Sequence, residues 1–184
     1  MHSVLRRSRK AAGVAVFAAA VALAGVALLT GGASGDTKDK TVRSAGDEQF
    51  VPNAKIMATL RFSPGHTVID SGATLTFEHS DKTEDPHTLS IVNADEVPTD
   101  VEGVFECGAP GTVCDEVFQL LPPDDLPPPF TNGPGTGPGI DGRLDTLVVF
   151  PGESASAEVT APSGTTLHYL CAIHAWMQGE ITVK

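Results

Sequence analysis

The C-terminal part of the chain holds a short run of sulfur and imidazole side chains. Cys171, His174 and Met177 follow one another at C-x2-H-x2-M spacing. A thiolate, an imidazole and a thioether are soft or borderline ligands, and they suit a copper ion that moves between Cu(I) and Cu(II). A complete site of this kind needs a second imidazole. His87, which follows Pro86 at the start of a strand-like run, is the candidate, and only a folded sheet can bring it to the loop.

The chain has three cysteines, an odd number. Cys107 and Cys114 bracket a short segment that contains Gly108, Pro110 and Gly111. In an oxidising compartment this spacing predicts a small disulfide-closed loop, and two free thiols are the alternative. If the two residues pair, Cys171 remains as the single thiol available to a metal.

The first 33 residues have the pattern of an export signal. Arg6, Arg7, Arg9 and Lys10 precede an uncharged apolar run over residues 11–29, and small residues follow at 31–35. We interpret residues 1–33 as a signal peptide, with an uncleaved N-terminal membrane anchor as the alternative. Both interpretations place the remaining chain outside the cytoplasm, which means in the periplasm, at the cell surface or in the extracellular space. The sequence leaves Sec and twin-arginine export both open.

The charge balance limits the class of partner. The formal net charge is −11, and removal of residues 1–33 takes away four basic residues and no acid. An acidic chain of this kind is no nucleic-acid binder, which needs a basic face. The acidity predicts protein partners with basic patches, and the alternative is that it serves solubility alone.

The elements that must position these side chains are predicted to be short strands. Residues 34–47 are small and polar and are interpreted as a linker, followed by one domain over 48–184. We expect no helix in that domain apart from a short turn at 115–121, and the pattern favours an all-β sandwich. The expected strands cover residues 55–62, 66–70, 73–79, 87–92, 145–150, 154–160, 165–171 and 179–184.

Glycine and proline are abundant, with 19 and 14 residues. They concentrate in residues 94–143, which include Pro127-Pro128-Pro129 and a Gly/Pro run at 133–139. Proline lacks the N–H that a central strand needs, and glycine weakens a strand. Residues 94–143 are therefore predicted to be a long Pro/Gly-rich insertion on the surface.

Several segments together resemble the cupredoxins, which are small exported blue copper proteins. The segments are Phe62 with Pro64 and Gly72, Leu75-Thr76-Phe77, Asp81, Pro86-His87-Thr88, residues 145–152, residues 168–171 and residues 179–183. Within this amicyanin/plastocyanin-like resemblance, the short ligand loop looks most like the amicyanin branch, since plastocyanin-like loops place the Met further along. The resemblance covers about residues 48–93 and 144–184. It implies a Greek-key β-sandwich that binds one type 1 copper ion.

The resemblance also implies a role for each ligand. His87, Cys171 and His174 would be the strong ligands, and Met177 the weak axial ligand. The chain departs from the family at Thr88, where many members have an Asn that ties the ligand loop. It also lacks the prolines that flank the loop histidine in amicyanin-like proteins, which predicts a softer loop.

The resemblance implies that the protein transfers electrons between redox protein partners. We expect it to be a monomer and not an enzyme. The alternative is a copper carrier or buffer with the same ligands. Trp176 is either a core residue or part of an apolar patch near the copper. His66, His79 and His168 are predicted to lie on the surface, with a position at the end of the sheet near the site as the alternative for His79.

Overall fold

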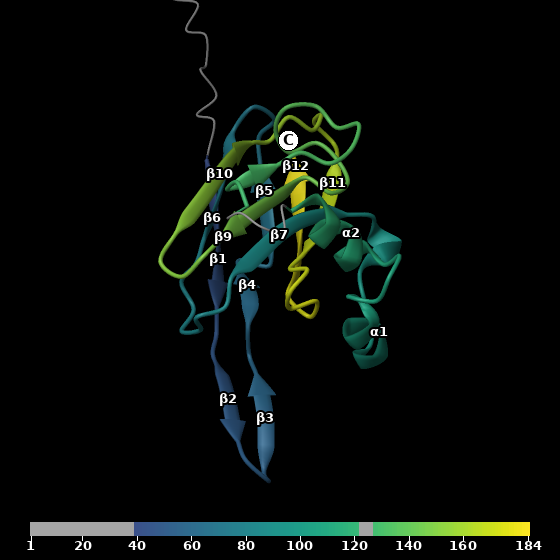
Figure 1. The fold of residues 1–184 in the computed structure, drawn as a ribbon. Helices are drawn as coiled ribbons and strands as arrows, with labels where there is room; N and C mark the ends of the chain where they lie inside the picture. Colours follow the sequence, from purple (N-terminus) through teal and green to yellow (C-terminus); the bar gives the residue numbers. More distant parts are fainter. Residues whose placement is uncertain (1–38, 122–126) are drawn as a thin grey trace, which may run out of the picture. The chain divides into compact units, whose positions relative to one another are not determined.

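The computed structural model describes residues 39–121 and 127–184, and these described residues form one compact unit (Figure 1). The described strands and helices are β1 (Lys40–Ala45), β2 (Glu48–Val51), β3 (Lys55–Ala58), β4 (Arg61–Ser63), β5 (His66–Ile69), β6 (Thr74–Glu78), β7 (His87–Val92), the 3-10 helix η1 (Ala94–Glu96), α1 (Val101–Glu106), α2 (Val113–Leu120), β8 (Phe130–Thr131), β9 (Thr146–Val149), β10 (Ser154–Glu158), β11 (Thr166–Leu170) and β12 (Gln178–Val183).

Two sheets form the body of this unit. One has the strand order β10-β6-β1-β4, and the other has the order β5-β12-β11-β7-β9-β8. Most neighbours are antiparallel, but β1 pairs with β6 and β5 pairs with β12 in parallel. Side chains from both sheets share one core, in which Phe77, Leu147 and Ile181 are fully buried. The prediction of an all-β sandwich is confirmed.

The predicted linker is wrong at residues 40–45, because these residues form β1 in the middle of the four-stranded sheet. Val42 and Ser44 point inward and are fully buried. Val42 is the single large apolar side chain of the strand KTVRSA, so its period-2 signal was too weak to indicate a strand.

The expected single strand over residues 55–62 is in fact two strands. β3 pairs with β2 in a separate hairpin, in which all eight residues are exposed, and β4 joins the four-stranded sheet. Phe50 and Ile56 face each other across the hairpin at 71% and 81% exposure. Figure 1 shows the hairpin projecting away from the two sheets.

The insertion at 94–143 is more ordered than predicted. It forms η1, α1, α2 and the edge strand β8. The short turn expected at 115–121 is the helix α2, but the expectation of no other helix is wrong. Thr112 caps α2, and Val113, Cys114 and Val117 bury one face of that helix. This face packs with Leu170 of β11 and the loop residues after it as a second apolar cluster. Helix α2 and these residues lie far apart in the sequence, so the sequence pattern could not predict that they pack together.

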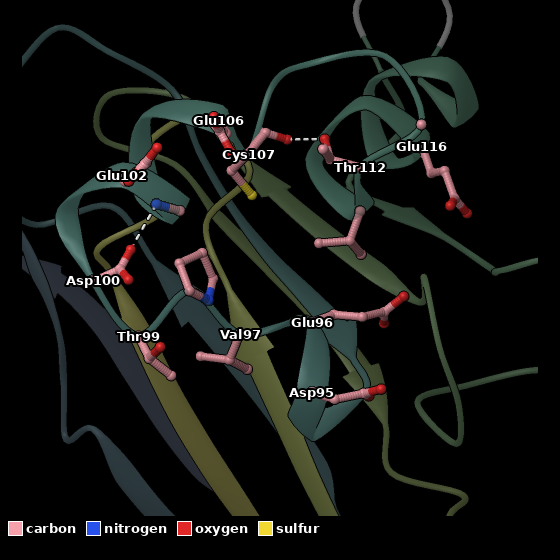
Figure 2. A pocket seen from close by; sticks show the side chains of 14 residues that line it. Asp95, Glu96, Val97, Thr99, Asp100, Glu102, Glu106, Cys107, Thr112 and Glu116 are labelled. Carbon is pink, nitrogen blue, oxygen red and sulfur yellow. Dashed lines mark hydrogen bonds between the residues drawn. The ribbon is translucent and has the colours of Figure 1, made fainter.

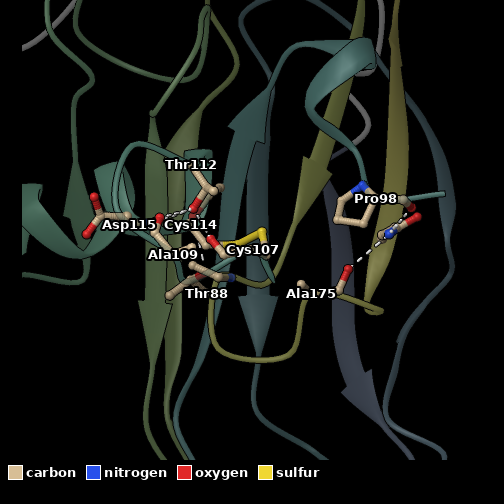
Figure 3. Close-up of a disulfide and its surroundings, with 11 residues drawn as sticks. Thr88, Pro98, Cys107, Ala109, Thr112, Cys114, Asp115 and Ala175 are labelled. Atoms are coloured by element: carbon tan, nitrogen blue, oxygen red, sulfur yellow. Dashed lines mark hydrogen bonds between the residues drawn. A yellow bond between two sulfur atoms is a disulfide. The ribbon is translucent and has the colours of Figure 1, made fainter. Parts of the chain in front are cut away.

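A disulfide connects the two helices of the insertion, as the cysteine spacing predicts. Cys107 and Cys114 are bonded, and both are buried in the second cluster (Figure 3). The bond closes a loop of eight residues between the end of α1 and the first turn of α2. It therefore holds α1 beside the loop that carries the candidate ligands, since Ala172 and Ala175 belong to the same cluster.

The interpretation of residues 1–33 as an export signal or anchor lies outside the described residues and stays a prediction. Within the described part of the chain, no helix has the length and apolar character needed to cross a bilayer.

Candidate metal centre

Three predicted ligands meet at one end of the six-stranded sheet. The Sγ atom of Cys171 lies 3.8 Å from Nδ1 of His87 and 3.8 Å from Nδ1 of His174, and the two Nδ1 atoms are 3.1 Å apart. All three side chains are buried. The fold thus brings His87 to a loop more than 80 residues away, as the sequence predicts.

The two sulfur–nitrogen distances would allow one metal ion to contact all three atoms. Bonds of about 2.0–2.1 Å to nitrogen and about 2.3 Å to sulfur, spread at about 120°, place a nitrogen and a sulfur about 3.8 Å apart. The observed separations of Sγ from both nitrogens match that value. Two imidazoles and one thiolate in a trigonal arrangement are the ligand set of blue copper sites.

Strand ends and a short turn position the three ligands. His87 is the first residue of β7, and Cys171 follows the last residue of β11, which pairs with β7. The backbone N–H of Met177 donates to the carbonyl of His174, and the N–H of Cys171 donates to the carbonyl of Met177. These bonds close residues 171–177 into a compact loop. Met177 is fully buried within the core, and its role as axial ligand stays a prediction.

Thr88 ties the two ligand segments together. Its backbone N–H donates to Sγ of Cys171 at 3.4 Å, and its Oγ1 accepts a hydrogen bond from the N–H of Ala172 at 2.9 Å. Ser90 Oγ also donates to this hydroxyl. The threonine therefore links β7 to the loop in the place where many cupredoxins have an asparagine.

A buried carboxylate lies behind His87. Oδ2 of Asp81 is 2.7 Å from Nε2 of His87, on the side of the ring opposite to the Nδ1 that faces Cys171. Both side chains are fully shielded from solvent. Asp81 contributed to the family resemblance, but no spacing rule indicated that it contacts a ligand.

Burial keeps the ligand imidazoles neutral. It lowers the pKa of His87 to about 4, although the carboxylate of Asp81 acts in the opposite direction, and it also lowers the pKa of His174. Burial raises the pKa of the Cys171 thiol. In the copper-free protein both histidines thus present unprotonated nitrogen near pH 7, and a bound cation would favour the thiolate.

The lowered pKa of His87 predicts acid sensitivity of the copper-free protein. Between pH 6.5 and about 4, the unfolded chain holds a proton on this imidazole that the folded chain does not hold. The free energy of unfolding therefore falls as the pH falls through this window, by on the order of 3 kcal/mol at most. Asp81, with a pKa lowered to about 2, loses its contribution only below its ordinary value of 3.8.

Urea unfolding of the copper-free protein at several pH values between 7 and 4.5 measures this effect. Copper-loaded protein is the control, because bound metal adds its own stabilisation and keeps protons off the ligands. A free energy of unfolding that stays constant over this range in the copper-free protein would contradict the assignment.

The remaining predicted residues divide between surface and interior. His66 is exposed, and His168 is partly exposed beside Glu180, as predicted. The predicted surface position of His79 is wrong: it is buried, with its ring centroid 5.1 Å from that of His87, which agrees with the alternative. Trp176 is 40% exposed and its ring contacts His174, with centroids 5.2 Å apart, so it lies at the surface beside the site.

The two-sheet β-sandwich agrees with the fold that the resemblance implies. Two sheets share one core, and the histidine that begins β7 meets the loop that follows β11. The fold is cupredoxin-like. Two carboxylates that the sequence did not indicate, Glu48 and Asp85, also lie close to the ring of His174 in this cupredoxin-like fold.

The solved structures that are similar to this chain include cupredoxins. A purple cupredoxin from Nitrosopumilus maritimus is 15% identical, with 79% of this chain and all of that chain covered and a TM-score of 0.42. Auracyanin from Roseiflexus castenholzii is 23% identical over 78% of this chain and 96% of that chain, with a TM-score of 0.42. Auracyanin A from Chloroflexus aurantiacus is 13% identical over 80% and 100%, with a TM-score of 0.44. No protein-family model and no curated protein matches the sequence.

Proposed function

We propose that this protein is an exported single-domain blue copper protein that binds one type 1 copper ion and carries single electrons between redox proteins. The observation that supports it most is the convergence of two Nδ1 atoms and one Sγ, in which both sulfur–nitrogen separations are those expected around one metal ion. The predicted export signal supports a location outside the cytoplasm.

The ligand residues suit electron transfer better than chemistry on a substrate. A copper ion bound here would supply a one-electron Cu(I)/Cu(II) couple. The protein's part is to hold His87, Cys171 and His174 in one geometry, which the β7–β11 pairing and the hydrogen bonds of Thr88 do. Their burial excludes water from the ligands, so little has to rearrange when the charge of the site changes.

His174 is the ligand through which an electron would enter or leave. It lies on a loop, its ring contacts the partly exposed Trp176, and its Nε2 is 3.8 Å from the half-exposed carboxylate of Asp85. His87, in contrast, is fully buried. A partner that covers Trp176 therefore comes close to a copper ligand.

The surface beside Trp176 suits a partner that presents an apolar side chain next to basic ones. A groove lies between α1 and Trp176, and Val101 and Phe105 of α1 are 70% and 83% exposed there. An acidic hollow adjoins it and shares Pro98, Thr99 and Asp100 with the groove (Figure 2). The hollow's carboxylates are Asp95, Glu96, Asp100, Glu102, Glu106 and Glu116.

Arg143 pairs with two of these carboxylates, Glu96 and Glu116. Among the described residues no ion pair involves the other four, so the hollow keeps an excess of negative charge. Charge complementarity thus favours a protein partner with a basic patch, which the composition also predicts.

Replacing Phe105 by Ser should slow electron exchange with such a partner. A basic cytochrome c serves as the probe, and stopped-flow absorbance gives the second-order rate constant. We expect a decrease of about fivefold or more, the effect of losing one well-placed apolar contact. Exchange with the small complex hexaammineruthenium should not change, because that complex needs no docking surface.

Ile56→Ser on the β2–β3 hairpin is the matched control, since Ile56 is equally exposed at 81%. Its rate constant with cytochrome c should stay at the wild-type value. A decrease for Ile56→Ser together with a normal rate for Phe105→Ser would place docking on the hairpin and contradict the groove.

Retention of copper during redox cycling separates an electron carrier from a copper carrier or buffer. The loaded protein is reduced with hexaammineruthenium(II) and reoxidised with ferricyanide, repeatedly, in the presence of a Cu(I) chelator that absorbs visibly. An electron carrier keeps its copper through many cycles because its ligands are buried. Transfer of the copper to the chelator within the first cycles would support the carrier or buffer and contradict the proposal.

A further inference from the structure

Asp81 and His87 form a close and buried contact. Their atoms Oδ2 and Nε2 are 2.7 Å apart, and both side chains are fully buried. Neither atom has a hydrogen-bond partner elsewhere in the described part of the chain, and the close pair itself is not aligned as an ideal hydrogen bond. A buried ring nitrogen and a buried carboxylate oxygen without other partners have only each other to satisfy them.

The rest of the carboxylate is anchored, so that Oδ2 is held toward the ring. Oδ1 accepts hydrogen bonds from the backbone N–H of Thr83 at 2.8 Å and from its hydroxyl at 2.6 Å. His79 is the other titratable group beside the carboxylate, and its Nε2 lies 3.8 Å from Oδ1 and 2.9 Å from the carbonyl oxygen of Asp85. His79 thus already has a partner. Against the effect of burial, a hydrogen bond from the Ser44 side chain also lowers the pKa of Asp81, and the 2.7 Å distance places Oδ2 next to the ring of His87.

We propose that Asp81 is a positioning residue for His87: it holds the ring proton on Nε2, points the Nδ1 lone pair at the metal position, and lowers the reduction potential of bound copper through its buried negative charge. The inference rests on the proposed function for its potential, but the position of the proton is a property of the copper-free protein.

Two physical effects carry the proposal. A neutral imidazole has one protonated nitrogen, and the partner of one nitrogen decides which one can bind a metal. A negative charge close to a ligand favours Cu(II), the more positive of the two copper states, and it acts strongly here because no solvent screens it.

The second carboxylate near the centre provides an internal comparison. Asp85 lies 3.8 Å from Nε2 of His174, but its side chain is 54% exposed. Water and salt screen such a charge. The two carboxylates thus differ in burial while each faces one ligand histidine.

The first test compares the reduction potentials of Asp81→Asn and Asp85→Asn with that of the wild type. Asp81→Asn should shift the Cu(II)/Cu(I) equilibrium toward Cu(I) by at least tenfold, which is about 59 mV for a one-electron couple. Asp85→Asn should shift it less than threefold. Equal shifts in the two variants, or an unchanged potential in Asp81→Asn, would overturn the assigned electrostatic role.

The second test needs no copper. Long-range nitrogen–proton NMR spectra of the copper-free wild type report which ring nitrogen of His87 carries the proton. We expect the proton on Nε2, with a loss of this preference in Asp81→Asn, because one amide oxygen cannot serve both Thr83 and His87. A proton on Nδ1 in the wild type would overturn the positioning role. A protein that binds no copper would instead contradict the proposed function, and this NMR test would still decide the position of the proton.

Discussion

Replacing Cys171 by Ser is expected to abolish the intense visible absorption of the Cu(II)-loaded protein. That absorption comes from charge transfer between a thiolate and Cu(II), and Cys171 is the single free cysteine of the described residues, with Sγ 3.8 Å from both Nδ1 atoms. A serine hydroxyl is a hard and weakly acidic ligand that cannot replace a thiolate in this role. The extinction in the visible should fall by more than an order of magnitude, as measured by titrating copper-free protein with Cu(II).

The double variant Cys107→Ser/Cys114→Ser is the control, because it removes two cysteines that are not candidate ligands. These two cysteines are bonded to each other and offer no thiolate to a metal, so the blue band should persist while the protein loses about 2–3 kcal/mol of stability. Full visible absorption in Cys171→Ser would mean that the chromophore does not involve this residue.

Replacing Gly179 by Ala is expected to destabilise the protein by about 3 kcal/mol and to disturb the metal centre. A Cβ atom at residue 179 would lie 2.4 Å from Cζ and 2.4 Å from Oη of Tyr169, and 2.6 Å from the carbonyl oxygen of Gly65. Tyr169 is fully buried and pairs with Gly179 across β11 and β12. Either the tyrosine or β12 has to move, and β12 begins directly after Met177 of the ligand loop.

Gly65→Ala is the matched control, because a Cβ atom there would have no neighbour closer than 3.9 Å. Urea unfolding gives the free energies, and the visible spectrum of the copper-loaded form reports on the ligands. Gly179→Ala with the stability and spectrum of the wild type would show that the contact with Tyr169 does not constrain the loop.

The candidate ligands could be proposed from the sequence because the information is local. Three of the four predicted ligands lie in a seven-residue loop, and their soft or borderline donor atoms suit a copper ion. His87 is distant, but it begins a clear apolar strand, and a strand start is a fixed place in a sheet. The alternating pattern of residues 73–79 likewise predicted β6 within two residues.

Other features depend on packing between distant segments. β1 has a single large apolar residue, Val42, and becomes a strand because β6 and β4 lie on either side of it. The helices of the insertion are short, and α2 is stabilised by a buried face against β11 and the ligand loop. The many Pro and Gly residues around them predicted a surface insertion without regular structure. The spacing of Cys107 and Cys114, which form a disulfide, was the local feature that indicated an ordered loop.

The surroundings of the ligands were the least predictable part of the site. Asp81 reaches His87 because residues 79–86 fold back over the end of the sheet, which the hydrogen bonds of Thr83 and His79 fix. The need for glycine at residue 179 comes from the ring of Tyr169 on the neighbouring strand. Both relations are contacts in space that leave no periodic signal in the sequence.

The electron paramagnetic resonance spectrum of the protein loaded with one equivalent of Cu(II) tests the copper assignment most directly. Two Nδ1 ligands and a thiolate in a trigonal arrangement spread the unpaired electron onto sulfur, so the spectrum should show a single copper species with unusually small hyperfine splitting along the main axis. A spectrum with the large splitting of copper bound by nitrogen and oxygen alone would show that Cys171 is not a ligand, and it would contradict the type 1 site.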